Sequence, residues 1–128
     1  MITLDTHAWI WWASSPDKLS RSARKACSDA DTLVVPAISA WEVAMLVSRG
    51  RLGLDRDVEE WIRLALVLPK VRLAPLTPVI AVLSTRLPGA LHGDPADRMI
   101  AATALANGAR LVTKDERLAA YPHVHTVW

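Results

Sequence analysis

The sequence predicts an α/β fold in which helices cover both faces of a central, mainly parallel sheet of four to five strands. Short apolar runs alternate along the chain with longer segments that begin at helix-capping residues. This alternation is typical of parallel sheets, because each crossover between parallel strands needs a long connection, usually a helix. A length of 128 residues suits one domain, so we expect a single domain over residues 1–128.

Five short apolar runs are the predicted strands. Turns, charged residues or prolines bound them, and they lie at residues 2–4, 33–35, 71–74, 110–113 and 124–127. The first run stops at Asp5, and Asp115 soon follows the fourth. Acidic side chains therefore lie just past two of the predicted strands.

Capping residues indicate where several helices begin. Ser20 can cap a helix that runs to about residue 30. Thr77-Pro78 and Asp94-Pro95 each place a capping side chain before a proline at the first helical position. We expect a helix to start at each of these three points.

Two further segments fit the capping-box pattern, in which a polar N-cap residue is followed three positions later by glutamate. They begin at Ser39 and at Asp57, with Glu42 and Glu60 as the glutamates that reach back. We expect helices to begin at both. The geometry would also aim the Glu42 carboxylate at a helix N-terminus, beside the strand ends.

Composition narrows the class of protein. The net charge of +2 is compatible with nucleic-acid binding but does not indicate it. Cys27 is the only cysteine, which excludes an internal disulfide and favours a reducing compartment. Because no basic, apolar leader and no apolar run of ~18 residues is present, we expect a cytoplasmic protein that does not enter a membrane.

Four acidic residues share one kind of position, just past a predicted strand or in the first turn of a predicted helix. In parallel α/β sheets these positions meet at the carboxyl edge, where ligands bind. Carboxylates gathered there repel one another and must take up protons or a cation. Mg²⁺ or Mn²⁺ is the usual solution, and we expect such an ion to be held by Asp5, Glu42, Asp97 and Asp115.

Each acid also has a structural interpretation. Asp5 and Asp115 can cap the helices that follow them, and Glu42 can complete its capping box. Asp94, before Pro95, is the better cap of its helix, and Asp97, one turn in, is expected to face the site. The sequence leaves open a site to which both contribute, one of them through a water.

Four segments in this order resemble the motifs of the PIN domain, including its VapC-type toxins from bacterial toxin–antitoxin pairs. The segments are Leu4-Asp5-Thr6-His7-Ala8, Ser39-Ala-Trp-Glu42, Asp94-Pro-Ala-Asp97-Arg98 and Leu111-Val-Thr-Lys-Asp115. The resemblance covers essentially the whole chain. It implies a three-layer α/β/α fold and a Mg²⁺- or Mn²⁺-dependent endoribonuclease that cleaves RNA.

The resemblance also implies a homodimer that a small cognate antitoxin inhibits by covering the acidic site with its tail. The catalytic and metal-binding acids of the family carry over as Asp5, Glu42, Asp97 and Asp115, and the nearby Asp94 is an alternative to Asp97 for the third of these positions. Two rivals remain open. One is a flavodoxin-like phosphoryl-transfer domain with Asp5 as phosphate acceptor, and the other is a non-catalytic RNA- or protein-binding module.

Several other residues carry weaker signals. Arg98 and Lys114 lie beside acids and are candidates for steering the RNA backbone, although solvated cations explain both. Trp9 and Trp12, at helical spacing, favour packing in the core or a dimer over stacking on bases. Thr113 can donate its hydroxyl to a carboxylate. The four histidines share no zinc-ligand spacing, so we expect no zinc site.

Overall fold

The computed structural model describes residues 1–128 and alternates strands with helices throughout. The strands are short, between two and four residues each. In chain order the elements are β1 (Ile2–Leu4), α1 (Thr6–Ser14), the 3-10 turn η1 (Pro16–Lys18), α2 (Arg21–Asp29), β2 (Leu33–Pro36), α3 (Ala37–Ser48), α4 (Val58–Leu66), β3 (Val71–Ala74), α5 (Pro78–Thr85), α6 (Pro95–Ala106), β4 (Arg110–Val112), α7 (Glu116–Ala119) and β5 (Thr126–Val127).

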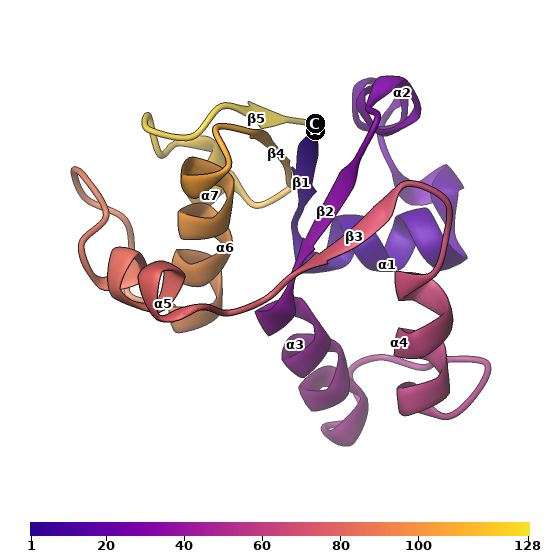
Figure 1. Cartoon of the computed structure of the whole chain (residues 1–128). Helices are drawn as coiled ribbons and strands as arrows, with labels where there is room; N and C mark the ends of the chain where they lie inside the picture. Colours follow the sequence, from indigo (N-terminus) through magenta and orange to yellow (C-terminus); the bar gives the residue numbers. More distant parts are fainter.

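All five strands pair in parallel in the order β3-β2-β1-β4-β5, which confirms the predicted parallel sheet (Figure 1). The chain first builds β1, β2 and β3 in one direction and then places β4 on the other side of β1. This strand order differs from the flavodoxin-like order 2-1-3-4-5, so that rival fold is wrong. The reversal of direction puts the topological switch point between β1 and β4.

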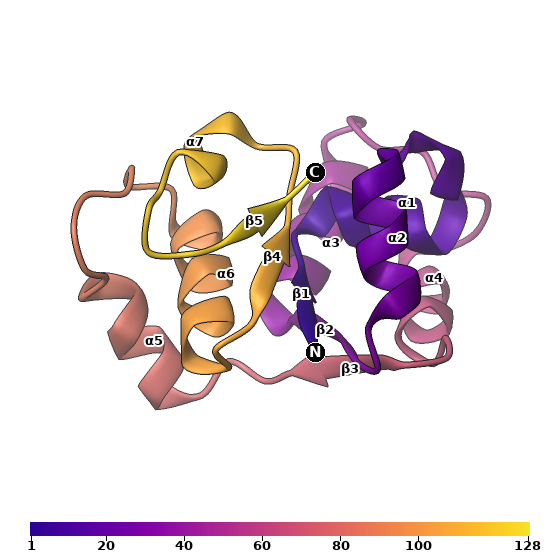
Figure 2. The same cartoon turned by 90° about the horizontal axis from the view of Figure 1, so that it is seen from above.

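Helices cover both faces of the sheet, as predicted. Figure 2 shows α1, α2 and α4 on one side and α5, α6 and α7 on the other. Alternate strand residues face the two layers: Ile2 and Leu4 pack in the cluster with α1, α2 and α4, whereas Leu111 packs in the cluster with α6 and α7. The sheet is therefore the middle of three layers.

Trp9 is the largest side chain of the first cluster and is fully buried. Its indole packs edge-to-face on Trp61 of α4, with ring centroids 5.2 Å apart, and its Nε1 donates to the Ala65 carbonyl at 3.3 Å. The prediction that Trp9 is a packing residue is confirmed. No helix of the chain is long and apolar enough to cross a bilayer.

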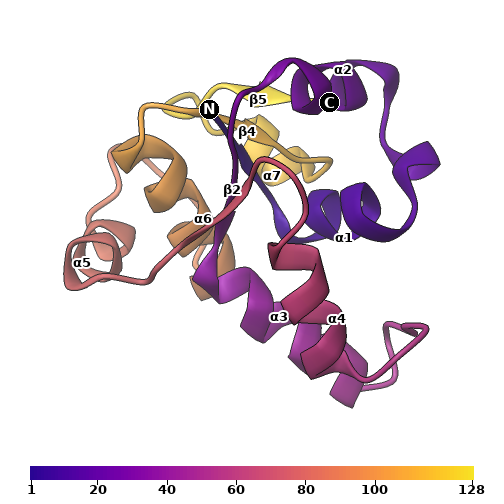
Figure 3. The same ribbon diagram turned by 45° about the vertical axis from the view of Figure 1, so that its right-hand side comes forward.

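Most predicted helix starts are confirmed by their capping bonds. The side chains of Ser20, Asp57, Thr77 and Asp94 each accept a backbone N–H in the first turn of the helix that follows. The capping box at Ser39 is wrong, because α3 begins at Ala37, directly after β2, without a side-chain cap. Figure 3 shows α3 extending from the end of β2 toward α4.

Candidate active site

Asp5 lies at the switch point, directly after β1, and is the N-cap of α1. Its carboxylate accepts the Thr6 amide at 2.8 Å and the Thr113 hydroxyl at 2.6 Å. Thr113 follows β4, so this second bond joins the ends of the two strands that flank the switch point. The predicted donation from Thr113 to a carboxylate is confirmed.

Glu42 reaches the same place from the second turn of α3. Its Oε1 accepts a 2.5 Å hydrogen bond from the Thr6 hydroxyl, which lies 3.0 Å from the Ser39 hydroxyl. When Glu42 is ionised, the single hydroxyl proton of Thr6 goes to its carboxylate, and the Ser39 hydroxyl then donates to Thr6. Ser39 thus holds Glu42 in place through Thr6, in a role different from the predicted cap.

Asp97 is in the first turn of α6 and is buried, whereas its neighbour Asp94 is exposed. Asp94 caps the helix by accepting the Asp97 amide at 2.9 Å. The Asp97 carboxylate is 2.7 Å from Nε2 of His92, which precedes the helix. The structure therefore separates the two acids as expected: Asp94 faces outward and Asp97 inward.

Asp115 follows β4 and caps the short helix α7, with its Oδ1 accepting the amides of Arg117 and Leu118. The Arg117 guanidinium extends past it and lies 3.4 Å from Asp115 and 3.6 Å from Asp97. Burial alone would raise the pKa of Asp115. The hydrogen bonds from Leu118 and Arg117 outweigh it and hold that pKa below the usual value.

The acids at the site influence one another's pKa values through their charges. Burial raises the pKa of Asp5, and the negative charge of Asp115 raises it further. Burial likewise raises the pKa of Asp97, with further increases from Asp5, Asp94 and Asp115. Burial together with the charges of Asp5, Asp97 and Asp94 raises the pKa of Glu42 to about 7. The fold thus concentrates negative charge at the switch point.

Hydrogen bonds hold each carboxylate in place, and the carboxylate oxygens do not surround a common position. As they stand, no three His, Cys, Asp or Glu side chains form a group that could hold a metal ion. All four predicted site acids nonetheless converge on the edge of the sheet where β1 and β4 end. Their partners there are hydroxyls, one imidazole and one guanidinium.

The chain has relatives of the same fold among known proteins. The model of the PIN domain matches residues 2–124. The chain belongs to the PIN-domain family. It is 42% identical to Ribonuclease VapC22 of Mycobacterium tuberculosis, over 99% of this chain and 98% of that protein. The resemblance to PIN domains and VapC-type proteins is confirmed.

Solved structures show the same PIN fold at low sequence identity. VapBC2 from Rickettsia felis, bound to a DNA fragment from its promoter, matches with a TM-score of 0.69 and 18% identity over 98% of this chain and 97% of that chain. FitAcB from Neisseria gonorrhoeae matches with a TM-score of 0.66 and 21% identity over 98% and 96%. The expected three-layer architecture is that of these structures.

Two residues at the acidic site of this PIN domain were not predicted from the sequence. His92 contacts Asp97 from a loop, and Arg117 contacts two acids from α7. Arg117 follows Asp115 by two residues, so its proximity to that acid could have been inferred. No local spacing signals the contact of His92, because the path of its loop is set by tertiary packing.

The loop that carries His92 is fastened from two sides. Arg98, predicted as a candidate for steering RNA, instead points into the protein and donates to the carbonyls of Ser84 at 2.8 Å and Leu91 at 2.7 Å. The Tyr121 hydroxyl donates to the Pro88 carbonyl at 2.5 Å. The interpretation of Arg98 as an RNA contact is therefore wrong, because its donors are used to fix the loop.

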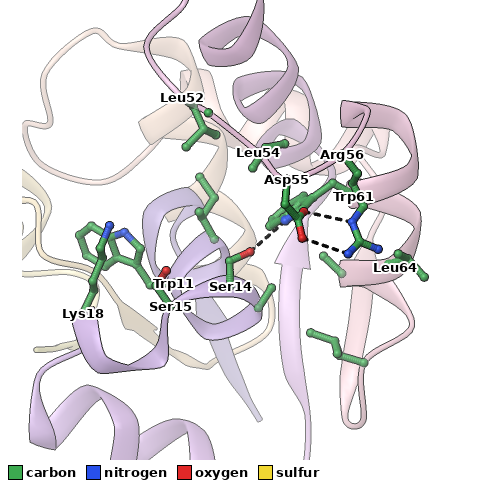
Figure 4. A pocket seen from close by; sticks show the side chains of 15 residues that line it. Trp11, Ser14, Ser15, Lys18, Leu52, Leu54, Asp55, Arg56, Trp61 and Leu64 are labelled. Atoms are coloured by element: carbon green, nitrogen blue, oxygen red, sulfur yellow. Dashed lines mark hydrogen bonds and ion pairs between the residues drawn. The ribbon is translucent and has the colours of Figure 1, made fainter.

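A separate groove of about 510 Å³ lies between α1, α4 and the loop that joins α3 to α4. In Figure 4, Trp11 and Lys18 lie at one end of it and Arg56 and Leu64 at the other. None of the four site acids lines this groove. It is mostly apolar, and it lies on the α1 side of the acidic site.

Proposed function

We propose that this PIN domain is a Mg²⁺- or Mn²⁺-dependent endoribonuclease that acts as the toxin of a toxin–antitoxin pair. The observation that carries the proposal is the convergence of Asp5, Glu42, Asp97 and Asp115 at the switch point, where three of them have raised pKa values. Identity of 42% to a protein named as a ribonuclease supports the choice of RNA as substrate.

The donor set fits a hard divalent cation. Carboxylate oxygens are the preferred protein ligands of Mg²⁺ and Mn²⁺. Because Mg²⁺ retains several waters and needs only one or two carboxylates directly, a closed cage of ligands is not required. Asp5 and Asp97 are the best placed to hold the ion, since burial raises the pKa of both and the charge of Asp5 raises that of Asp97 further, and Glu42 and Asp115 complete the negative field.

A bound ion would acidify water and stabilise the charge that develops on the scissile phosphate. The neighbouring residues would keep the carboxylates ionised and hold them in fixed orientations. Thr113 fixes one oxygen of Asp5, and His92 fixes one oxygen of Asp97. Thr6, supported by Ser39, fixes Glu42. Each of these donors stabilises the charged form of its carboxylate and thereby favours cation binding.

We further propose a small cognate antitoxin as partner. Support comes from the structural neighbours, which are solved toxin–antitoxin assemblies such as the complex from Klebsiella pneumoniae, with a TM-score of 0.66. The apolar groove beside α1 offers a surface that a partner helix can fill. We expect one domain over residues 1–128, acting in the cytoplasm, where its RNA substrate is present.

A homodimer is the third part of the proposal. Large apolar side chains are exposed along one continuous stretch, from the outer strand β3 into α5: Leu73, Leu76, Val79 and Val82. Monomers rarely leave such a stretch in water, so it favours contact with a second copy. Val79→Lys should convert the dimer to a monomer in light scattering. A wild-type chain that is already monomeric would contradict this part alone.

The central experiment uses the chain purified free of any partner. It is incubated with structured and unstructured RNA, with Mg²⁺ or Mn²⁺ and with EDTA, and product ends are mapped. We expect metal-dependent internal cleavage. Cleavage that persists in EDTA would contradict the metal mechanism, and metal-independent binding without product ends would favour the non-catalytic rival.

A further inference from the structure

Three aromatic rings lie in a row beside the acidic site. The centroid of Trp11 is 5.7 Å from that of His7 and 5.7 Å from that of Trp128, with tilted ring planes. The ammonium of Lys114 lies 5.9 Å from the centroid of Trp11. His7 and Lys114 are exposed, and both tryptophans are half-buried. Aromatic surface and a positive charge are thus both open to solvent here.

This row adjoins the acids through the chain itself. His7 follows Asp5 by two residues, and its charge lowers the pKa of that carboxyl. Lys114 is the residue between Thr113, which donates to Asp5, and Asp115. A nucleotide whose phosphate lies at the acids therefore has its base or its next phosphate within reach of these rings.

A second Lys–Trp pair in the same protein, Lys70 and Trp12, has a purely structural role and serves as a comparison. Lys70 lies 6.0 Å from the centroid of Trp12, almost the same distance as in the Lys114–Trp11 pair. Its ammonium, however, donates to the carbonyls of Cys27, Ser28 and Ala30, at 2.8, 3.0 and 2.9 Å. Lys70 thus serves to fix the end of α2, whereas the ammonium of Lys114 has no hydrogen-bonding partner in the protein.

We propose that His7, Trp11 and Trp128 form a stacking surface for an unpaired base of the RNA substrate, with Lys114 contacting a phosphate next to that base. The inference rests on the proposed ribonuclease function and adds the residues that hold the substrate beside the acidic site. Aromatic side chains and a nearby cation are the usual means by which proteins hold unpaired bases and their backbone.

The charge pattern favours RNA over a protein at this surface. Trp11 also borders the apolar groove, so a partner helix is the competing occupant. Neither His7 nor Lys114 lines the groove, however. Both are polar and lie next to site acids in the chain, His7 two residues after Asp5 and Lys114 directly before Asp115. The ammonium of Lys114, next to the proposed metal site, can contact one phosphate of an RNA strand while the metal holds another.

The test uses the full chain carrying Asp97→Asn, which should bind RNA without cleaving it. Fluorescence anisotropy measures the affinity for a short, unstructured oligoribonucleotide labelled at one end. We expect Trp11→Leu to weaken binding about tenfold, in keeping with the loss of one stacked base. Trp12→Leu removes an equally half-buried indole from the structural pair and should leave the affinity unchanged.

Further controls separate a loss of stacking from a loss of structure. Trp11→Tyr keeps an aromatic ring and should retain most of the wild-type affinity, whereas a purely structural defect would lower the affinity of both Trp11 variants. If Trp11→Leu does not fold, His7→Ala and Lys114→Gln test the same surface, and each should weaken RNA binding. In the cleaving wild-type background, Trp11→Leu should raise KM more than it lowers kcat. An oligoribonucleotide with abasic residues should bind weakly to all variants and show no effect of Trp11→Leu.

Equal affinities for Trp11→Leu and Trp12→Leu would overturn the inference while leaving the ribonuclease intact. Loss of binding to a co-expressed antitoxin with unchanged RNA affinity would assign Trp11 to a protein interface and also overturn it. A wild-type chain that neither binds nor cleaves RNA would instead overturn the proposed function, and with it the stacking surface.

Discussion

Two aspartates at the switch point, Asp5 and Asp97, have pKa values shifted in the opposite direction to those of two surface aspartates, Asp31 and Asp55. A hydrogen bond from the N-terminal amine, with the charge of that amine, lowers the pKa of Asp31, and a hydrogen bond from Arg56 lowers the pKa of Asp55. Burial raises the pKa of Asp5 and Asp97, with neighbouring acids adding to the increase. Asp31 and Asp55 have their cation within the chain, whereas Asp5 is bonded only to an amide and a hydroxyl, and under the proposed function a divalent ion supplies the missing charge.

The buried acids of the site differ from the surface acids in their effect on the stability of the metal-free protein. Buried carboxylates without a full counter-charge oppose folding, and binding of a cation reverses that effect. Arg117 supplies a partial substitute, but its guanidinium is largely exposed and more than 3 Å from both acids. The acidic site is therefore better suited to binding an ion than to stabilising the fold.

The largest expected effect is on cleavage. Asp97→Asn removes one charge from the site but keeps the size of the side chain, so metal binding and cleavage should fall at least ~100-fold. Cleavage of a labelled RNA under single-turnover conditions measures the rate. A rate within a few-fold of wild type would show that Asp97 does not hold the ion.

A smaller loss is expected when an acid is kept but its donor is removed. Thr113→Val preserves the buried shape and deletes the hydroxyl that donates to Asp5. Loss of such a supporting bond typically costs ~10–100-fold in metal affinity, and we expect a shift of about tenfold in the Mn²⁺ concentration that gives half-maximal cleavage. Thr103→Val, which removes a buried hydroxyl bonded within α6, should leave that concentration unchanged.

The pH dependence of the metal-free protein follows from Glu42. Its pKa is raised from 4.5 to about 7 in the folded state, so between these values the folded chain binds more protons than the unfolded chain. Stability in EDTA should therefore fall as the pH rises from about 4.5 to 7, by on the order of 1 kcal/mol after allowance for partial exposure.

Urea unfolding at pH 5 and pH 8 measures this difference. Glu42→Gln should reduce the difference in unfolding free energy between the two pH values, because glutamine does not titrate. Saturating Mg²⁺ should reduce this difference as well. A metal-free wild type that becomes more stable over this interval would contradict the sign.

The smallest effect is expected at the surface. Asp31 is exposed and pairs with the N-terminal amine at 2.9 Å, where water screens the charges. Asp31→Asn should leave both the cleavage rate and the urea midpoint unchanged within error. A loss of activity comparable to that of Asp97→Asn would remove the distinction between the two sets of acids.

Much of the site could be predicted because strand ends fix position. Asp5 and Asp115 follow β1 and β4, and the strand order brings those two ends together. Proline at the first turn of α6 favoured Asp94 as the cap, but the sequence did not separate the roles of Asp94 and Asp97 at the site. These are local signals whose spatial consequence follows from the rules for parallel sheets.

What could not be predicted depends on tertiary packing. Glu42 was placed at the site for a mistaken reason: α3 starts at Ala37, so Glu42 meets Thr6 from the second turn and caps nothing. His92 reaches Asp97 only because Arg98 and Tyr121 fix its loop. The row of rings around Trp11 likewise joins α1 to the end of the chain.

Titration of Mn²⁺ into the metal-free protein at pH 7 tests the central claim most directly, because the ion must replace protons on acids whose pKa values are raised. Electron paramagnetic resonance reports free Mn²⁺, and calorimetry in two buffers of different ionisation enthalpy reports proton release. We expect saturable binding with net release of protons, and at least tenfold weaker binding to Asp5→Asn. Absence of binding, or equal binding by wild type and Asp5→Asn, would contradict a cation site at the switch point.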